Sequence, residues 1–237
     1  LVSLHMRFAV TLLAAPALMP PLYAQQNLAW DANGASAGTG GSGTWDTSAA
    51  SWFNGTTFQA WQNPAFDNAL FGGTPGSVTL GAPITARNIV FNSSGYVLNG
   101  STLTLGGITR PIILVNTPMA VINSTLAGSD GLIKNGTGTL VLTADNTGFD
   151  GITTVFAGTL RVDHANALGI STAASDLVLN NGSTLYFNTD FTHDYTLMGN
   201  VVNVQGGEGT TWQGSPTLAA PTTLNLNGMA GTLSGDL

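Results

Sequence analysis

Carboxylates, histidines and aromatic rings are the side chains in this sequence whose chemistry could serve a reaction or a ligand. Hydrolysis of a glycosidic bond needs two carboxyl groups held roughly 5 to 9.5 Å apart. The candidates are Asp145 with Asp150 around one turn, and Asp190 with Asp194 beside His193. Aspartates in turns also accept hydrogen bonds from the surrounding backbone, without any catalytic role. We favour this second interpretation and predict that the chain is not an enzyme.

Motifs for nucleophilic, metal or nucleotide chemistry are missing or incomplete. The sequence has no cysteine and no H-E-x-x-H pair. Gly38, Gly40 and Gly43 match a dinucleotide-type pattern, but no strand precedes them and no helix pattern follows. We therefore expect no catalytic, cofactor-binding or metal-binding residues, and we place His164 and His193 at exposed loop positions.

Tryptophans are concentrated in the Gly-, Ala- and Ser-rich segment 25–76. Trp45, Trp52 and Trp61 could form a platform for carbohydrate, because flat aromatic rings with a polar edge suit amphipathic ligands. The alternative is burial, since the open end of a stack of repeats must be covered by an atypical segment. We favour burial and predict that residues 25–76 form an aromatic-rich N-terminal cap. Coplanar, exposed indoles would instead support carbohydrate contact.

The composition favours an all-β chain. Charged residues make up 7% of the 237 residues, against about 25% in ordinary soluble domains. Helix formers are scarce, with Glu208 as the single glutamate and Lys134 as the single lysine. The formal net charge is −7, and Arg87, Arg110 and Arg161 are scattered along the chain. Because phosphate binding needs a concentrated basic face, we predict that nucleic acid is not a partner.

Short apolar segments bounded by Gly, Asn, Pro or Ser run through the chain beyond residue 76. Such spacing suits either a β-sandwich or a β-helix. The segments expected to be strands are 78–80, 88–91, 96–98, 102–105, 112–115, 176–179, 183–187, 200–204 and 223–226.

The shortness of these segments and their corners favour the β-helix. Asn-Gly pairs recur at 99–100, 135–136 and 181–182, and Gly readily adopts the left-handed conformation that can turn a chain from one face to the next. We predict an all-β fold, a right-handed parallel β-helix (solenoid), over residues 77–237.

The densest run of strands and turns is GLIKNGTGTLVLTADNTGFDGITTVFAGTLRV, at residues 131–162. Its order is Lys-Asn-Gly-Thr-Gly-Thr-Leu-Val-Leu, then Asn146-Thr147 with Gly151, then Ala-Gly-Thr-Leu-Arg-Val at 157–162. This order resembles the autotransporter-associated β-strand repeat, also called the passenger-associated transport repeat. The resemblance implies an autotransporter passenger of the type V secretion kind, built as a right-handed parallel β-helix.

The same resemblance implies what the protein does. We expect a non-catalytic structural shaft with an adhesion role, located at the bacterial cell surface, in the outer membrane or outside the cell. The repeat is implied to aid secretion and folding. Implied partners are an outer-membrane translocation barrel, which we expect to lie outside this chain, and polysaccharide or cell-surface ligands. A β-helical polysaccharide-degrading enzyme and a carbohydrate-binding module remain the alternatives.

The two ends of the sequence carry further expectations. Arg7, the apolar run 8–18 and Ala24 before Gln25 are typical of a signal peptide, which we assign to residues 1–24. The last residues, 231–237, repeat the order found at 124–132, where it leads directly into the repeat. We therefore expect a passenger fragment truncated at the C-terminus, without its further coils.

Overall fold

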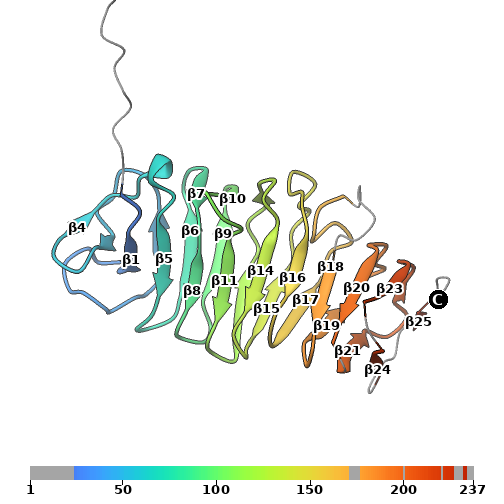
Figure 1. Ribbon diagram of the computed structural model, residues 1–237. Coiled ribbons are helices and arrows are strands. Elements are labelled where there is room, and N and C mark those ends of the chain that lie inside the picture. Colours follow the sequence, from blue (N-terminus) through green and yellow to red (C-terminus); the bar gives the residue numbers. More distant parts are fainter. Residues whose placement is uncertain (1–23, 171–176, 200, 220, 227–231, 234–237) are drawn as a thin grey trace, which may run out of the picture.

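The fold is a stack of flattened coils, each laid on the one before it (Figure 1). The computed structural model describes residues 24–170, 177–199, 201–219, 221–226 and 232–233. Residues 1–23 of the predicted signal peptide lie outside these ranges. No helix within the ranges is both long and apolar enough to cross a membrane.

Two long sheets face each other across the core, and each successive coil adds one strand to both of them. Neighbouring strands are parallel, apart from a short antiparallel extension at the N-terminal end, where β3 pairs with β1 and with β4. The first sheet contains β1 (Asn27–Trp30), β3 (Trp52–Phe53), β4 (Phe58–Gln59), β5 (Asn68–Phe71), β8 (Ile89–Phe91), β11 (Ile112–Val115), β14 (Leu132–Asn135), β16 (Thr153–Val155), β18 (Leu177–Asn180), β20 (Tyr195–Met198) and β23 (Pro216–Leu218).

The second sheet runs alongside the first with the same coil order. It contains β2 (Gly43–Trp45), β6 (Ser77–Leu80), β9 (Val97–Gly100), β12 (Met119–Ile122), β15 (Thr139–Leu142), β17 (Thr159–Val162), β19 (Thr184–Phe187), β21 (Val201–Gly206) and β24 (Thr223–Asn225). A smaller sheet holds β7 (Ile84–Ala86), β10 (Leu103–Leu105) and β13 (Leu126–Ala127), and β22 (Thr211–Trp212) pairs with β25 (Thr232–Leu233). A short 3-10 helix, η1, covers Asn63–Ala65.

The core forms because alternate residues of each strand point inward. Leu140 of β15 pairs with Leu160 of β17, which pairs with Leu185 of β19, and all three are fully buried. Burying one such leucine contributes about 1.5–3 kcal/mol. Each coil therefore gains its stability by laying its inward residues on those of its neighbour.

The parallel β-helix predicted from the sequence is confirmed. The expected Asn-Gly corners also adopt the expected backbone, because Gly100, Gly136 and Gly182 have φ values of 92°, 79° and 74°. The stacked arrangement distinguishes the fold from a sandwich, whose neighbouring strands would be antiparallel.

Candidate functional site

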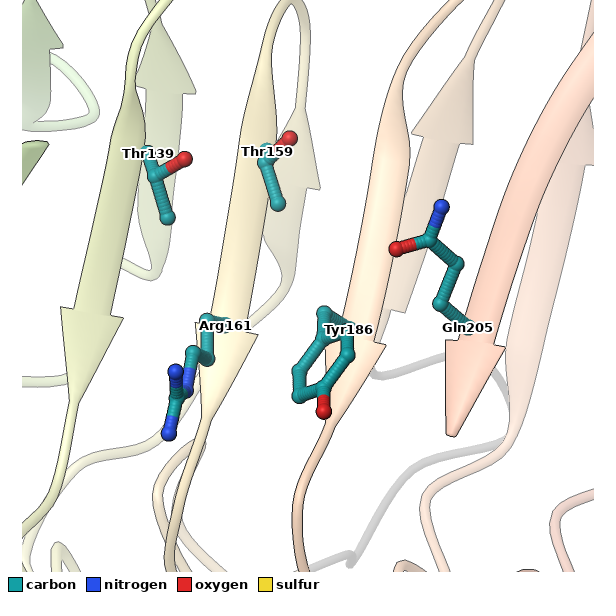
Figure 2. Close-up of a pocket in the computed structure, with 5 residues that line it drawn as sticks. All are labelled: Thr139, Thr159, Arg161, Tyr186 and Gln205. Atoms are coloured by element: carbon teal, nitrogen blue, oxygen red, sulfur yellow. The ribbon is translucent and has the colours of Figure 1, made fainter. Parts of the chain in front are cut away.

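A shallow depression lies on the outer surface of the second sheet (Figure 2). Its volume is about 240 Å³. Four consecutive strands, β15, β17, β19 and β21, supply its lining, which consists of Thr139, Thr159, Arg161, Tyr186 and Gln205. We call these five residues the polar depression.

The register of the sheet places these side chains in rows across the strands. Arg161 pairs with Tyr186, and Tyr186 pairs with Gln205, so the three occupy one row. Thr139 pairs with Thr159 in a second row two residues earlier along each strand. Because side chains alternate between faces, inward leucines at 140, 160 and 185 leave these positions facing outward.

Arg161 is the charged group of the polar depression. Its Nε donates to Asp163 Oδ1 at 2.7 Å, and its guanidinium carbon lies 5.3 Å from the centroid of the Tyr186 ring. The hydrogen bond to the Asp163 carboxylate raises the pKa of Arg161, so the guanidinium stays charged. Its terminal nitrogens make no hydrogen bond to the described part of the protein, and they remain available to a ligand.

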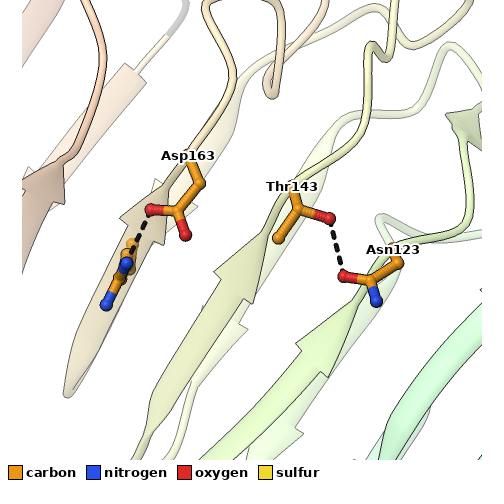
Figure 3. A network of polar contacts seen from close by, with 4 residues as sticks. Asn123, Thr143 and Asp163 are labelled. Carbon is orange, nitrogen blue, oxygen red and sulfur yellow. Dashed lines mark hydrogen bonds and ion pairs between the residues drawn. The ribbon is translucent and has the colours of Figure 1, made fainter.

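Asn99, Asn123 and Thr143 form a polar ladder at the ends of neighbouring strands, and these side chains differ from those of the polar depression because they bind one another. Asn123 Nδ2 donates to Asn99 Oδ1 at 2.8 Å, and Thr143 Oγ1 donates to Asn123 Oδ1 at 2.7 Å. Figure 3 shows the Asn123–Thr143 contact beside the Asp163 ion pair of the next strand. The ladder amides and hydroxyl therefore bind one another, whereas the hydroxyls of Thr139 and Thr159 lack a side-chain hydrogen bond within the described ranges.

The three candidate tryptophans are packed together inside the N-terminal end of the solenoid. Trp45, Trp52 and Trp61 are fully buried. The ring centroids of all three pairs lie 4.8 Å apart, with interplanar angles from 55° to 78°. They are therefore neither coplanar nor exposed, and no ring face is open to a saccharide. The three rings instead form a buried aromatic cluster near the N-terminal end.

The candidate carboxylates are engaged by the turns around them. Asp150 Oδ1 accepts from the Gly151 N–H at 2.7 Å. Asp190 Oδ1 accepts from the Thr211 N–H at 2.9 Å, and Asp194 Oδ1 accepts from the Ser215 N–H at 2.8 Å, each across to the next coil. Asp145 Oδ1 accepts from the side-chain amide of Asn166 at 3.0 Å. These contacts are those of turn residues.

The expectation of an exposed histidine is wrong for His193. Its side chain is buried, its Nε2 lies 3.0 Å from the Gly169 carbonyl oxygen, and its ring stacks on Phe191 with centroids 4.6 Å apart. Phe191, two residues earlier in the same turn, packs against the His193 ring and stabilises its buried position. His164 is half-buried, and its Nδ1 accepts from the Asn166 N–H at 3.1 Å.

Lys134 is a buried cation that sequence reasoning did not identify as structural. It is fully buried, and its Nζ donates to the carbonyl oxygens of Gly136, Gly138 and Ala157 at 2.6, 2.5 and 2.9 Å. Burial lowers the pKa of Lys134 to about 8, because the ammonium loses its hydration. Strand alternation could have indicated the burial of Lys134, because it lies two residues after Leu132, which also points inward.

The free energy of unfolding is expected to rise between about pH 8 and pH 9.5. In that window the unfolded chain keeps the lysine proton, with a pKa of about 10.4, while the folded chain releases it. The unfolded state then binds more protons, so stability increases with pH. The gain is about 2 kcal/mol at most, since bonds from the ammonium to three carbonyls oppose the release of the proton.

Urea unfolding at about pH 7.5 and pH 9.5 measures this effect. Burial raises the pKa values of Tyr96 and Tyr195 in the folded chain, and their ordinary pKa of about 10 in the unfolded chain lies above the window. The control is Lys134→Met, which cannot titrate and should lack the rise. Equal stability of the wild-type protein at both pH values would show that the carbonyl oxygens hold the proton.

Comparison with known proteins gives two matches. Residues 132–162 match the family model described as passenger-associated-transport-repeat. The chain is 46% identical to the Adhesin BmaC autotransporter of Brucella suis biovar 1 (strain 1330) over 184 residues, which are 76% of this chain. This alignment covers 5% of that protein, so the chain spans only a small part of the relative's length. No solved structure matches the chain.

The sequence matches agree with the architecture. The matched repeat covers β14 to β17, and each of these strands pairs in parallel with the corresponding strand of the next coil. The longer match extends the relationship over most of the chain. The chain therefore belongs to the autotransporter passengers, which are exported to the bacterial cell surface, the outer membrane or the extracellular space.

Proposed function

We propose that this chain is a non-catalytic, adhesive section of a surface-displayed or released passenger. The observation that carries the proposal is the polar depression, where donors, acceptors and an aromatic ring face outward together. Elsewhere on the second sheet the ladder amides satisfy one another. The similarity to a protein named an adhesin supports the same role, and so does the use of the candidate aspartates in turns.

The ligand we propose is a hydroxyl-rich cell-surface molecule such as a polysaccharide. Arg161 and Gln205 can donate to its hydroxyl groups, and the threonine hydroxyls can both donate and accept. Adjacent strands lie about 4.8 Å apart, so the depression offers polar groups at regular steps along the solenoid axis. The net charge of −7 and the carboxylate of Asp163 disfavour a densely anionic polymer.

Binding of the full chain to immobilised bacterial and host-cell polysaccharides tests this role. Arg161→Ala and Tyr186→Ala are each expected to weaken binding about tenfold, because a charge-assisted hydrogen bond or a ring contact contributes about 1.5 kcal/mol. The matched control is Arg110→Ala, since Arg110 donates to Thr154 of β16, in the other long sheet. Unchanged binding in both test variants would refute the depression as the contact surface.

The remaining segments receive their roles within the same proposal. Residues 1–24 act as the export signal, residues 25–76 as the cap, and residues 77–237 as the shaft. The repeat at 132–162 aids secretion and folding, because a coil that pairs with the preceding one can fold as it emerges. A translocation domain of the full protein is the proposed partner in export.

A further inference from the structure

The corner between β14 and β15 is built around the Lys134 ammonium. An ammonium group has three N–H donors and no acceptor. Lys134 uses all three on backbone carbonyl oxygens, two from its own corner at Gly136 and Gly138, and one from Ala157 in the next coil. Within the described residues, no carboxylate forms an ion pair with it. Carbonyl dipoles alone therefore balance this buried charge.

The bond to Ala157 crosses from one coil to the next. Two backbone bonds flank it, since the Phe156 N–H donates to the Lys134 carbonyl at 2.8 Å and the Thr159 N–H donates to the Gly138 carbonyl at 3.2 Å. The two coils therefore meet around a single ammonium, with a backbone hydrogen bond on either side.

Gly158 completes the enclosure of the ammonium. A Cβ on this residue would lie 2.6 Å from Lys134 Nζ and 2.4 Å from the Gly136 carbonyl oxygen. The backbone of the second coil thus passes directly over the charge. Until this coil docks, the third N–H has no protein acceptor and must face water.

We infer that Lys134 is an ammonium lock that fastens the coil of β16 and β17 to the coil of β14 and β15. Docking of the second coil supplies the third acceptor and seals the charge from water in one step. Undocking leaves that donor unpaired and opens the charge to solvent. The junction therefore closes and opens as a unit, which gives the matched repeat a defined cross-coil fastening.

The lock requires a group with several N–H donors, which distinguishes it from simple packing. Lys134→Ala removes the three outer methylenes and the ammonium, a fragment that propylammonium reproduces. The variant is expected to lose on the order of 100- to 1,000-fold in its folding equilibrium constant, because three buried acceptors lose their partner. Propylammonium should restore at least about tenfold of that loss. Propanol, of similar size but with a single hydrogen-bond donor, should restore much less.

The experiment is denaturant unfolding of the full chain as wild type and Lys134→Ala, each with propylammonium or propanol at equal concentration. Wild-type stability under the two additives provides the correction for solvent effects. If the variant does not fold alone, its refolding yield with each additive replaces the equilibrium measurement. Wild-type-like stability of Lys134→Ala would overturn the inference. Equal recovery with both additives, or recovery with neither, would overturn it as well.

Chemical labelling provides a second measurement on the unaltered protein. Lys134 is the only lysine in the sequence, so an amine-reactive ester can modify it and the N-terminal amine alone. Lys134 should react at least about 100-fold more slowly than the N-terminal amine in the folded state, and it should be protected to the same degree as the Phe156 and Thr159 amides are protected from exchange with solvent. Fast labelling while those amides stay protected would contradict the lock.

Discussion

Replacing Gly138 with alanine is expected to destabilise the solenoid by at least about 3 kcal/mol. The added Cβ would lie 1.7 Å from the carbonyl oxygen of Thr117, on the preceding coil. That oxygen belongs to the backbone, so it cannot move aside as a flexible side chain could. The two coils must separate, which strains the hydrogen bond from the Gly138 N–H to the Val115 carbonyl, now 3.0 Å long.

Urea unfolding measures the loss, and Gly148→Ala is the matched control. Gly148 has an ordinary φ value and is exposed, and a Cβ there would meet only the Ala127 Cβ at 3.9 Å. The control should change stability by no more than about 1 kcal/mol, because only the entropy of the unfolded chain changes. Similar stabilities of the two variants would mean that the coils can move apart at little cost.

The second large effect is expected from Trp52→Ala, with a loss of about 3–5 kcal/mol. The Trp52 ring lies 4.8 Å from the rings of Trp45 and Trp61, 5.2 Å from Trp30 and 5.7 Å from Phe71, measured between centroids. Its removal would leave a cavity among rings that cannot collapse without breaking their own contacts. Thermal unfolding and near-ultraviolet circular dichroism would report the loss of stability and of ring packing.

The control for Trp52→Ala is Phe156→Ala, because Phe156 is a large aromatic side chain left 56% exposed. That change should alter stability by less than about 0.5 kcal/mol. The comparison also separates packing from carbohydrate contact at the tryptophans. Loss of polysaccharide binding by Trp52→Ala with unchanged stability would contradict the packing role.

The strands could be predicted because their pattern is local. Leu140 and Leu142 share one parity, and Leu160 and Val162 repeat it, so alternation alone marks the inward positions. The left-handed corners at Gly100, Gly136 and Gly182 were likewise predictable, since glycine supplies that backbone conformation more readily than other residues. The repeat at 131–162 was recognisable for the same reason, as its glycines, asparagines and apolar residues recur in a fixed order.

The polar depression could not be predicted, because its members come from four strands far apart in the sequence. The row Arg161, Tyr186 and Gln205 exists only through the register of β17, β19 and β21. Insertions of different length between coils change the spacing, so no fixed period in the sequence aligns these residues. The burial of His193 depended likewise on the stacking of its ring against Phe191.

By itself, the sequence determined the all-β architecture and many of the strand positions, since short-range alternation and turn chemistry encode both, and its resemblance to the passenger repeat indicated the family. The tertiary structure decided which polar groups stay free for a ligand and which form hydrogen bonds within the protein. Lys134 became a buried link between two coils and the tryptophans became a buried aromatic cluster, while the terminal nitrogens of Arg161 stayed open. The physical reason is that each outcome depends on the neighbouring coil, because a donor is satisfied only where stacking brings an acceptor within reach.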